Sequence, residues 1–424
     1  MKPDSLGWSL LLAARALARV DAGESLSEAM IPLTLEAQGA RAAAQDIVYG
    51  VLRRFGESEF VLGRLMRQKL AHAETYALLK AALYRLETRP DARPMVVDQA
   101  VTAAGELAEG RYKKLVNGVL RNYLRQREVL ISEGNDDEAV RARHPLWWVK
   151  RLKKDYPDRW ESVVDAGNSA PPMALRVNLR KTSADAYADA LAASGLKAKK
   201  LKARGEFGDA ALLLEVPVSV DRLPGFYDGL VSVQDLGAQC AATLLAPATG
   251  KRVLDACAAP GGKTAHLLES ADVDLVALDV DAVRAGRIEE NLRRLGLSAE
   301  VRVADCRALK TWWDGCAFDA VLVDAPCSGS GVVRRHPDIK ALRRESDIRK
   351  FAVTQGAILD ALWPTLAPGG RLLYATCSVF VEENAGVVDA FLVRRPDAES
   401  IQERQLLPDP EHDGFYYALL RKTA

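Results

Sequence analysis

The stretch KRVLDACAAPGGKT, residues 251–264, contains a short apolar segment that ends in an acid, then a glycine-bearing turn, then residues that favour a helix. Four more short apolar segments follow, separated by helical stretches such as DAVRAGRIEENLRRLG. They are VDLVALDV (273–280), AEVRVADC (299–306), FDAVLVDAPC (318–327) and GRLLYATC (370–377). Regular alternation of this kind is typical of βαβ units around a parallel sheet. The chain from residue 231 to 424 is therefore predicted to be an α/β domain.

The end of the turn looks like a phosphate-binding loop, and the segment FDAVLVD (318–324) looks like the strand that holds magnesium in nucleotide hydrolases. A phosphate loop of the form G-x-x-x-x-G-K-[ST] needs a glycine at position 257, where this chain has Cys257. Pro260 removes one of the amide donors that such a loop uses. The dinucleotide fingerprint G-x-G-x-x-G is missing as well. Because neither phosphate-binding pattern is complete in this chain, the sequence argues against a bound nucleotide phosphate.

Acidic residues stand near the ends of successive predicted strands, among them Asp255, Asp279 and Asp305. Ligands of parallel sheets bind beyond the carboxyl ends of the strands, so we expect these side chains to converge on one cleft. Asp279 is placed to bind both hydroxyls of a ribose, and Asp305 can accept a hydrogen bond from an adenine amino group. Each aspartate alone would more often be a helix cap. Together they indicate an adenosine with a sulfonium and an amino-acid tail, S-adenosylmethionine.

Two cysteines stand at the ends of the fourth and fifth strands. Cys327 follows Asp324 in the sequence DAPC, where enzymes that methylate exocyclic amines carry an aromatic residue, and Cys377 follows Thr376. C5 of a pyrimidine is not nucleophilic, but attack of a thiolate at C6 turns the ring into an enamine that can accept a methyl group at C5. A single buried cysteine is more often a small hydrophobe. Two cysteines at the ends of neighbouring strands instead indicate a catalytic role, and their spacing leaves open which of the two attacks the base.

The N-terminal part carries helical patterns only, up to about residue 130. A polar break at 132–138 ends this bundle, and residues 140–230 mix helix and strand signals such as MALRVNLR and ALLLEVPV. We predict three domains. They are an all-α bundle (residues 1–133), a small α+β segment that binds RNA (residues 134–230) and the catalytic domain (residues 231–424).

The net charge of +1 conceals three basic tracts, at residues 111–127, 197–204 and 334–350. A charge run is usually a solvated face, but three of them in a balanced chain favour a polyanionic partner, nucleic acid first. Arg334, Arg335 and His336 follow Cys327 closely and are predicted to meet RNA near the target. A solvent-facing role is equally compatible with each of them.

The composition is that of a soluble globular protein, with 49% hydrophobic and 27% charged residues. No run approaches the roughly 18 apolar residues of a membrane span, so we expect a cytoplasmic protein without a membrane partner. Six cysteines without a C-x-x-C pair do not indicate a disulfide framework, and five scattered histidines give no metal-ligand spacing, so no metal is expected.

Three motifs carry a resemblance to a known family. DACAAPGGKT (255–264), DAPCSGSGVVRRHPDIK (324–340) and YATCSVFVEEN (374–384) look like signatures of the RNA cytosine-C5 methyltransferases of the Sun/Nop2 family. The resemblance implies that Cys377 is the nucleophile, that Cys327 assists product release, and that Asp324 contacts the target base or the methionine end of the cofactor. It also implies S-adenosylmethionine contacts from Cys257, Ala258, Ala259, Pro260, Gly261, Gly262, Lys263, Asp279, Arg284, Asp305 and Asp324.

The N-terminal motifs AAAQDIVYGVLRR (42–54) and KKLVNGVLRNYLR (113–125) resemble the antitermination factor NusB, a helical RNA-binding fold. A NusB-like bundle fused to a Rossmann-like methyltransferase domain is typical of the bacterial members of the family that form 5-methylcytosine in 16S, small-subunit, ribosomal RNA. The expected partner is that RNA, free or partly assembled. Two alternatives are the same reaction on transfer RNA and a non-enzymatic RNA-binding factor of the NusB type, and a thiol redox role is a third.

Overall fold

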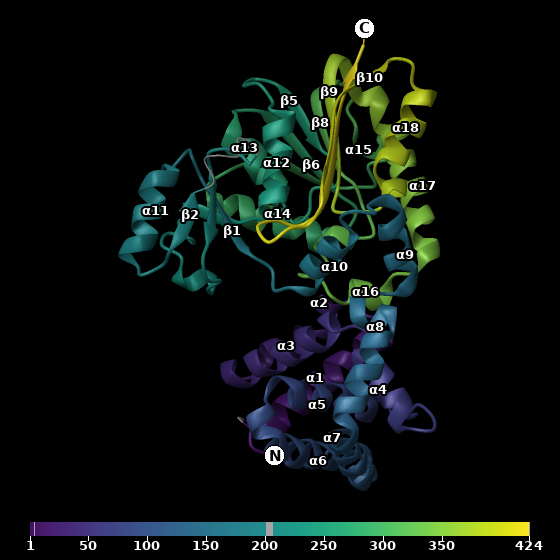
Figure 1. Ribbon diagram of the computed structural model, residues 1–424. Coiled ribbons are helices and arrows are strands. Elements are labelled where there is room, and N and C mark those ends of the chain that lie inside the picture. Colours follow the sequence, from purple (N-terminus) through teal and green to yellow (C-terminus); the bar gives the residue numbers. More distant parts are fainter. Residues whose placement is uncertain (4, 201–206, 424) are drawn as a thin grey trace. The chain divides into compact units, whose positions relative to one another are not determined.

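The computed structural model describes residues 1–3, 5–200 and 207–423 of the chain. The chain divides into two compact units (Figure 1). The helical unit comprises residues 1–169 and 333–345, and the sheet unit comprises residues 170–332 and 346–424. The basic tract predicted at 197–204 lies partly outside the described residues.

The helical unit contains only helices and loops among its described residues. Its α-helices are α1 (Leu6–Asp21), α2 (Leu26–Ala29), α3 (Gln38–Arg53), α4 (Glu57–Leu65), α5 (Ala73–Thr88), α6 (Arg93–Gly105), α7 (Lys113–Asp136), α8 (Glu138–Ala142), α9 (Leu146–Asp155), α10 (Trp160–Asn168) and α16 (Ile339–Leu342). The predicted all-α N-terminal bundle is thereby confirmed.

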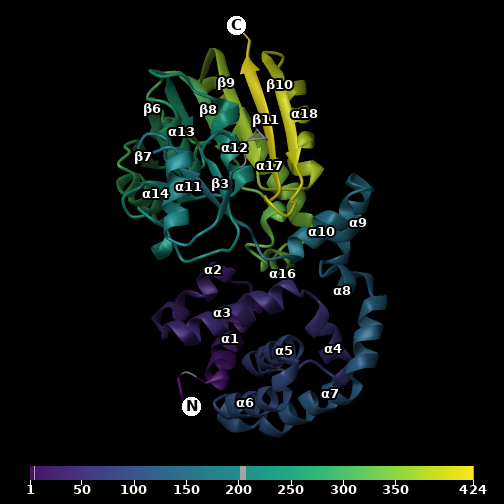
Figure 2. The ribbon, with the colours of Figure 1, turned by 60° about the vertical axis from the view of Figure 1, so that its left-hand side comes forward.

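Helix α5 lies at the centre of this bundle, surrounded by α1, α3, α4, α6 and α7 (Figure 2). Its sequence explains this place, because apolar residues cover most of its circumference. Leu78, Leu79, Ala82, Leu83 and Leu86, which recur with helical spacing on one face, are all at most 5% exposed. The core of the unit is built around them.

Helix α7 continues through the polar run in which we predicted the end of the bundle. Tyr123, Leu130 and Gly134 recur on one side of the helix and are buried. A β-carbon on Gly134 would stand 3.6 Å from the ring of Phe60 and 3.4 Å from the side chain of Val140. Packing on these two residues, which the local sequence does not reveal, therefore keeps the polar segment helical. The predicted boundary at 133 falls inside a helix.

The segment 333–345, which follows Cys327 closely in sequence, belongs to the helical unit. Asp338 accepts a hydrogen bond from the backbone of Leu26 at 2.9 Å. Lys340, only 1% exposed, donates to Asn168 Oδ1 at 2.6 Å and to the carbonyl of Arg53 at 3.3 Å. Arg334 is also 1% exposed. The prediction that Arg334 meets RNA is therefore wrong, because its side chain lies inside the protein.

The sheet unit begins with a small antiparallel sheet of order β2-β3-β1-β4. Its strands are β1 (Met173–Val177), β2 (Ala198–Lys200), β3 (Ala211–Leu214) and β4 (Val231–Val233), and α11 (Ala184–Ala193) packs beside them. The two segments predicted as strands in this region form β1 and β3. The predicted small α+β segment is thereby confirmed.

The large sheet has the order β10-β11-β9-β8-β5-β6-β7, and its strands from β9 to β7 run parallel (Figure 1). The bounds are β5 (Arg252–Asp255), β6 (Asp274–Asp279), β7 (Glu300–Val303), β8 (Phe318–Asp324), β9 (Leu366–Thr376), β10 (Ala398–Leu406) and β11 (Phe415–Lys422). Strand β11 pairs antiparallel with both of its neighbours, the edge strand β10 and β9. All five predicted strands are present, and β8 and β9 are neighbours as expected, so the predicted α/β domain is confirmed.

Helices cover both faces of this sheet. The covering helices are α12 (Leu236–Leu245), α13 (Gly262–Ser270) and α14 (Ala282–Leu295) on one face, and α15 (Leu309–Trp312), α17 (Glu345–Leu362) and α18 (Ala385–Arg394) on the other. Successive residues of a strand point to opposite faces. Val253 accordingly packs in one core and its neighbour Leu254 in the other. Strands buried on both faces need continuous apolar runs, which is why these segments were recognisable in the sequence.

Candidate active site

A cavity of about 310 Å³ lies at the carboxyl ends of the parallel strands β5 to β9. Of the residues singled out in the sequence, Cys257, Ala259, Asp279, Arg284, Asp305, Asp324, Cys327 and Cys377 line it. Ala258, Pro260, Gly261, Gly262 and Lys263 are not among its lining residues. Residues at the ends of five different strands thus meet at one site, as the strand pattern predicted.

The glycine-bearing turn after β5 owes its shape to close packing. Ala258 donates its backbone N–H to the carbonyl of Leu278 at 2.8 Å, which ties the turn to β6. Gly261 has φ +92°, in the left-handed region, and a β-carbon on it would lie 3.1 Å from the backbone of Ile288. Both features require glycine. The conformation therefore brings the backbone of the turn onto α14, while Cys257 and Ala259 face the cavity.

Asp279, at the end of β6, is held in place by backbone donors. Its Oδ2 accepts the N–H of Ala259 at 3.1 Å, and its Oδ1 accepts that of Asp281 at 3.1 Å. The residue is 4% exposed. Each carboxylate oxygen still has a second lone pair. Arg284 completes the corner, with Nη2 bonded to the carbonyl of Ala259 at 3.1 Å and 3.7 Å from Asp279 Oδ2.

Asp305 has a partner that we did not predict from the sequence. Arg307 binds it through two side-chain nitrogens, with Nε–Oδ1 3.0 Å and Nη2–Oδ2 2.6 Å, and its own N–H adds a bond to Oδ1 at 2.9 Å. These hydrogen bonds lower the pKa of Asp305. Arg307 also lines the cavity. The only signal in the sequence was the spacing Asp-x-Arg, which is common on surfaces.

Asp324, at the end of β8, forms an ion pair with Lys263, with Nζ–Oδ2 2.6 Å. Burial lowers the pKa of Lys263, but the charge and hydrogen bond of Asp324 outweigh that effect, and the net pKa is raised. Lys263 is therefore a cation, and it neutralises Asp324 from beneath the cavity. This explains how Lys263 contributes to the site without lining it.

The two thiols lie next to each other, with Cys327 Sγ 3.3 Å from Cys377 Sγ. The hydrogen bond between the sulfurs and burial raise the pKa of Cys327 well above its usual range. Cys327 therefore keeps its proton and can donate it to the sulfur of Cys377. The raised pKa of Cys327 argues against a thiolate at Cys327.

A buried carboxylate, Glu383, connects the loops that carry these thiols. Its Oε1 accepts the N–H of Ser328 at 2.8 Å, directly after Cys327. Its Oε2 accepts the hydroxyl of Ser378 at 2.7 Å, directly after Cys377. The residue is fully buried, and burial raises its pKa.

Helix α17 adds a second tie between these loops, because Gln355 Nε2 donates to Glu383 Oε1 at 3.2 Å and to the carbonyl of Pro326 at 2.9 Å. We did not assign a role to either residue from the sequence. Glu383 lies within the motif YATCSVFVEEN, which was the only sign of its importance in the sequence. Nothing in the sequence pointed to Gln355.

The buried carboxyl group of Asp255 is expected to make the stability of the protein depend on pH. It is fully buried, it accepts a hydrogen bond from Thr264 at 2.7 Å, and burial raises its pKa to about 7. The folded protein therefore holds a proton that the unfolded chain releases above about pH 4. Stability from this group is present below pH 4 and is lost as the pH rises through 7.

We expect Asp255→Asn to gain stability relative to wild type between pH 5 and pH 8, by up to a few kcal/mol. Urea unfolding of both proteins at the two pH values measures this difference, with Thr264→Val as a comparison that removes the hydrogen bond only. A difference that does not change with pH would contradict a buried, protonated Asp255.

No group of three or more histidine, cysteine, aspartate or glutamate side chains in the described part of the chain could hold a metal ion. No described helix has both the length and the apolar character that a membrane-spanning segment requires.

Three family models match consecutive parts of the chain. The NusB family model matches residues 9–125, and a ferredoxin-like domain of RsmF/B-like methyltransferases matches residues 144–221. The model described as 16S rRNA methyltransferase RsmB/F matches residues 242–421. These matches follow the order of the three predicted domains.

Relatives and solved structures agree with these matches. Ribosomal RNA small subunit methyltransferase B of Erwinia tasmaniensis is 44% identical over 416 residues, which cover 95% of this chain and 96% of that protein. The protein of the same name from Vibrio cholerae is 45% identical over 415 residues, covering 95% and 94%.

The solved structure of PH0851 shares the fold over 100% of this chain and 99% of that chain, with a TM-score of 0.81 and 23% identity. A methyltransferase homolog protein from Pyrococcus horikoshii, 28% identical, covers 67% of this chain and 97% of its own, with a TM-score of 0.59. From the site, the family models and the full-length relatives together, the chain belongs to the family of ribosomal RNA small subunit methyltransferase B proteins.

Proposed function

We propose that this chain transfers a methyl group from S-adenosylmethionine to C5 of a cytosine in small-subunit ribosomal RNA, with Cys377 as the covalent nucleophile. The observation that carries the proposal is the pair of thiols, Cys327 and Cys377, 3.3 Å apart. They line the same cavity as Asp279 and Asp305, the predicted ribose and adenine ligands. A nucleophile and a nucleoside site in one cavity support group transfer to a base.

The residues present fit S-adenosylmethionine. Asp279 and Asp305 lie near the ends of neighbouring strands, and the carboxylates offer lone pairs to hydroxyl and amino donors. Small side chains, Ala256 and Ala259, leave room between them. The volume of about 310 Å³ is in the range of small-molecule sites. When bound, S-adenosylmethionine supplies an electrophilic methyl group on a sulfonium.

The chemistry then follows from the two sulfurs. Cys377 as thiolate attacks C6 of the cytosine and forms a carbon–sulfur bond, which makes C5 an enamine carbon able to accept a methyl group. After transfer, the C5 proton passes to solvent as the C6–sulfur bond breaks, the C5–C6 double bond returns and Cys377 leaves as a thiolate. Cys327, a thiol 3.3 Å from the departing sulfur, can donate a hydrogen bond to it and so assist its release. Asp324 lines the same cavity and can contact the base.

Small-subunit ribosomal RNA is the proposed substrate because the two relatives quoted above carry that substrate in their names. The NusB match at 9–125 supports RNA as the partner. The experiment incubates the protein with tritiated S-adenosylmethionine and either unmodified small-subunit RNA or unmodified transfer RNA, and then identifies the labelled nucleoside. We expect 5-methylcytidine from the ribosomal RNA. Label in transfer RNA alone, or in a nucleoside other than 5-methylcytidine, would overturn the proposal.

Asp279→Asn tests the cofactor part of this proposal. We expect the affinity for S-adenosylmethionine to fall about tenfold to a hundredfold, because a hydrogen bond to a charged group contributes about 1.5–3 kcal/mol. Isothermal titration calorimetry measures the change. Asp274→Asn is the matched control, since Asp274 lies at the other end of the same strand and is exposed. Equal affinities of both variants would contradict the assignment of Asp279.

A further inference from the structure

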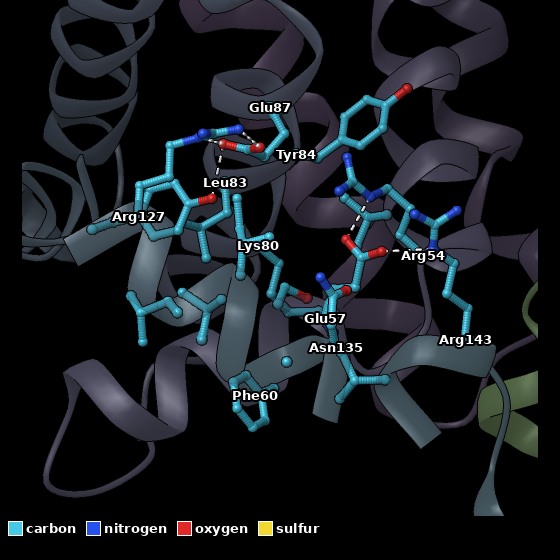
Figure 3. Close-up of a pocket in the computed structure, with 18 of the residues that line it drawn as sticks. Arg54, Glu57, Phe60, Lys80, Leu83, Tyr84, Glu87, Arg127, Asn135 and Arg143 are labelled. Atoms are coloured by element: carbon cyan, nitrogen blue, oxygen red, sulfur yellow. Dashed lines mark hydrogen bonds and ion pairs between the residues drawn. The ribbon is translucent and has the colours of Figure 1, made fainter. Parts of the chain in front are cut away.

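A second cavity, of about 320 Å³, lies within the helical unit and is walled by α3, α4, α5, α7 and α8 (Figure 3). Part of its wall is apolar and aromatic, with Phe60, Leu83 and Tyr84. Another part is basic. Five arginine and lysine side chains line the cavity against two glutamates. The combination of apolar and aromatic lining with an excess of cations is suited to a ligand with a ring and an anionic group.

Two of the arginines are braced by one acid. Glu57 lies between Arg54 and Arg143 (Figure 3). Its Oε2 accepts from Arg54 Nε at 2.5 Å, and its Oε1 accepts from Arg143 Nε at 2.6 Å. Both guanidinium groups bind Glu57 through Nε. Their Nη groups make no hydrogen bond within the described residues. A guanidinium fixed in this way offers parallel donors in the geometry that a phosphate requires.

The backbone at Arg143 supports a role for this arginine. It has φ +54°, in the left-handed region, at the end of α8. A non-glycine residue in that conformation costs roughly 1–2 kcal/mol, and glycine or asparagine would be the usual choice there. Two of the other three lining cations are matched by acids. Arg127 binds Glu87 through Nε and Nη2 at 2.8 and 2.6 Å, and Lys80 binds Asp21 at 2.9 Å. The third, Arg141, donates to the carbonyl of Asn135 at 3.0 Å.

Close packing fixes the ring of Tyr84. A β-carbon on Gly50 would stand 2.0 Å from a ring atom and 2.4 Å from the hydroxyl oxygen, so the hydroxyl end of the ring packs against α3. The residue is half-buried and lines the cavity. Tyr84 therefore contributes an immobile aromatic ring to the cavity wall.

We propose that this cavity binds one nucleotide of a single-stranded RNA, with its phosphate on Arg54 and Arg143 and its base against Phe60, Leu83 and Tyr84. The source of the nucleotide rests on the proposed RNA substrate, but the chemistry of the cavity does not. Such a site would anchor the RNA strand on the helical unit and would distinguish unpaired nucleotides from duplex, because a base must leave its stack to enter.

The first test compares RNA affinities of charge variants. The probe is a fluorescent single-stranded RNA of about twelve nucleotides, measured by anisotropy with the full-length protein. We expect Arg54→Gln/Arg143→Gln to bind about tenfold or more weakly. Arg15→Gln/Arg67→Gln, which removes two exposed arginines of the same unit outside the cavity, should change affinity less than about threefold. Equal losses in both double variants would mean general electrostatic attraction and would overturn the proposal.

Cross-linking locates the site independently of variants that can weaken the fold by leaving Glu57 unpaired. RNA containing 4-thiouridine is irradiated with the wild-type protein, and modified peptides are identified by mass spectrometry. We expect adducts on Phe60 or Tyr84. Adducts only outside the cavity, or adducts with 4-thiouridine monophosphate but none with RNA, would overturn the proposal.

A parallel measurement separates this inference from the proposed function. S-adenosylmethionine binding and methyl transfer at saturating RNA are followed in the same variants. If methyl transfer persists but no adducts form in the cavity, only the proposed nucleotide site is refuted. If adducts form in the cavity but no methyl group is transferred, only the proposed function is refuted.

Discussion

Cys377→Ala protein transfers no methyl group to RNA, and Cys327→Ala protein accumulates a covalent protein–RNA adduct: these are the results we expect from the pair of thiols. The first follows because no other sulfur at the end of β9 can form a bond to C6 of the base. The second follows because Cys327 is the protonated neighbour, 3.3 Å away, that would assist release. The loss at position 377 should exceed about a thousandfold, since removing a covalent nucleophile removes the reaction path itself.

The measurement uses tritiated S-adenosylmethionine and unmodified small-subunit RNA, followed by denaturing gels that show any RNA bound to protein. Cys316→Ala is the matched control, because Cys316 is an exposed thiol outside the cavity. It should behave as wild type. Methyl transfer by Cys377→Ala would refute the mechanism as stated. An adduct in Cys377→Ala and none in Cys327→Ala would exchange the roles of the two sulfurs.

The strand ends could be predicted from the sequence because their signals are local. A strand buried on both faces needs a continuous apolar run, and the residue after it is where the chemistry of the site appears. Asp279, Asp305, Cys327 and Cys377 were found in this way, and all four line one cavity. The N-terminal bundle was predictable for a similar reason, since helical periodicity is also local.

Features that depend on partners distant in the chain were not predictable. Lys340 looked like part of a solvated basic tract, yet it is buried because Asn168 and the carbonyl of Arg53 satisfy its donors. The bond between Arg307 and Asp305 fixes one wall of the cavity, and no pattern distinguished it from a surface pair. Similarly, the length of α7 depends on packing against Phe60. In each case a charged or polar sequence conceals a contact that only the fold creates.

Glu383→Ala is expected to lose methyl transfer by about a hundredfold or more while still binding S-adenosylmethionine normally. The carboxylate is the common acceptor for the N–H of Ser328 and the hydroxyl of Ser378, so its removal breaks two buried hydrogen bonds beside both thiols. Displacement of a reacting group by about 1 Å from such a change can cost about a hundredfold in rate. Asp279, the proposed cofactor ligand, makes no hydrogen bond to this network in the described residues.

The conservative variant Glu383→Gln separates positioning from simple folding. Its oxygen can still accept from Ser328, while its amide faces Ser378, so we expect intermediate activity. Glu382→Gln, at the exposed neighbour, serves as the control and should retain activity. The measurements are kcat, KM for RNA, and S-adenosylmethionine affinity by calorimetry. A parallel collapse of cofactor affinity and activity, or full activity in Glu383→Ala, would contradict a positioning role.

The pH profile adds a readout that a purely structural role would not change. Burial raises the pKa of Glu383, so this carboxylate becomes protonated at a higher pH than an exposed glutamate. In the ionised form both carboxylate oxygens of Glu383 accept hydrogen bonds. Protonation of one oxygen removes an acceptor, so one hydrogen bond between the loops that carry Cys327 and Cys377 is lost. The kcat of wild type should therefore fall as the pH drops through this raised pKa. Glu383→Gln cannot titrate, so its kcat should lack that acidic limb, whereas Glu382→Gln should keep it.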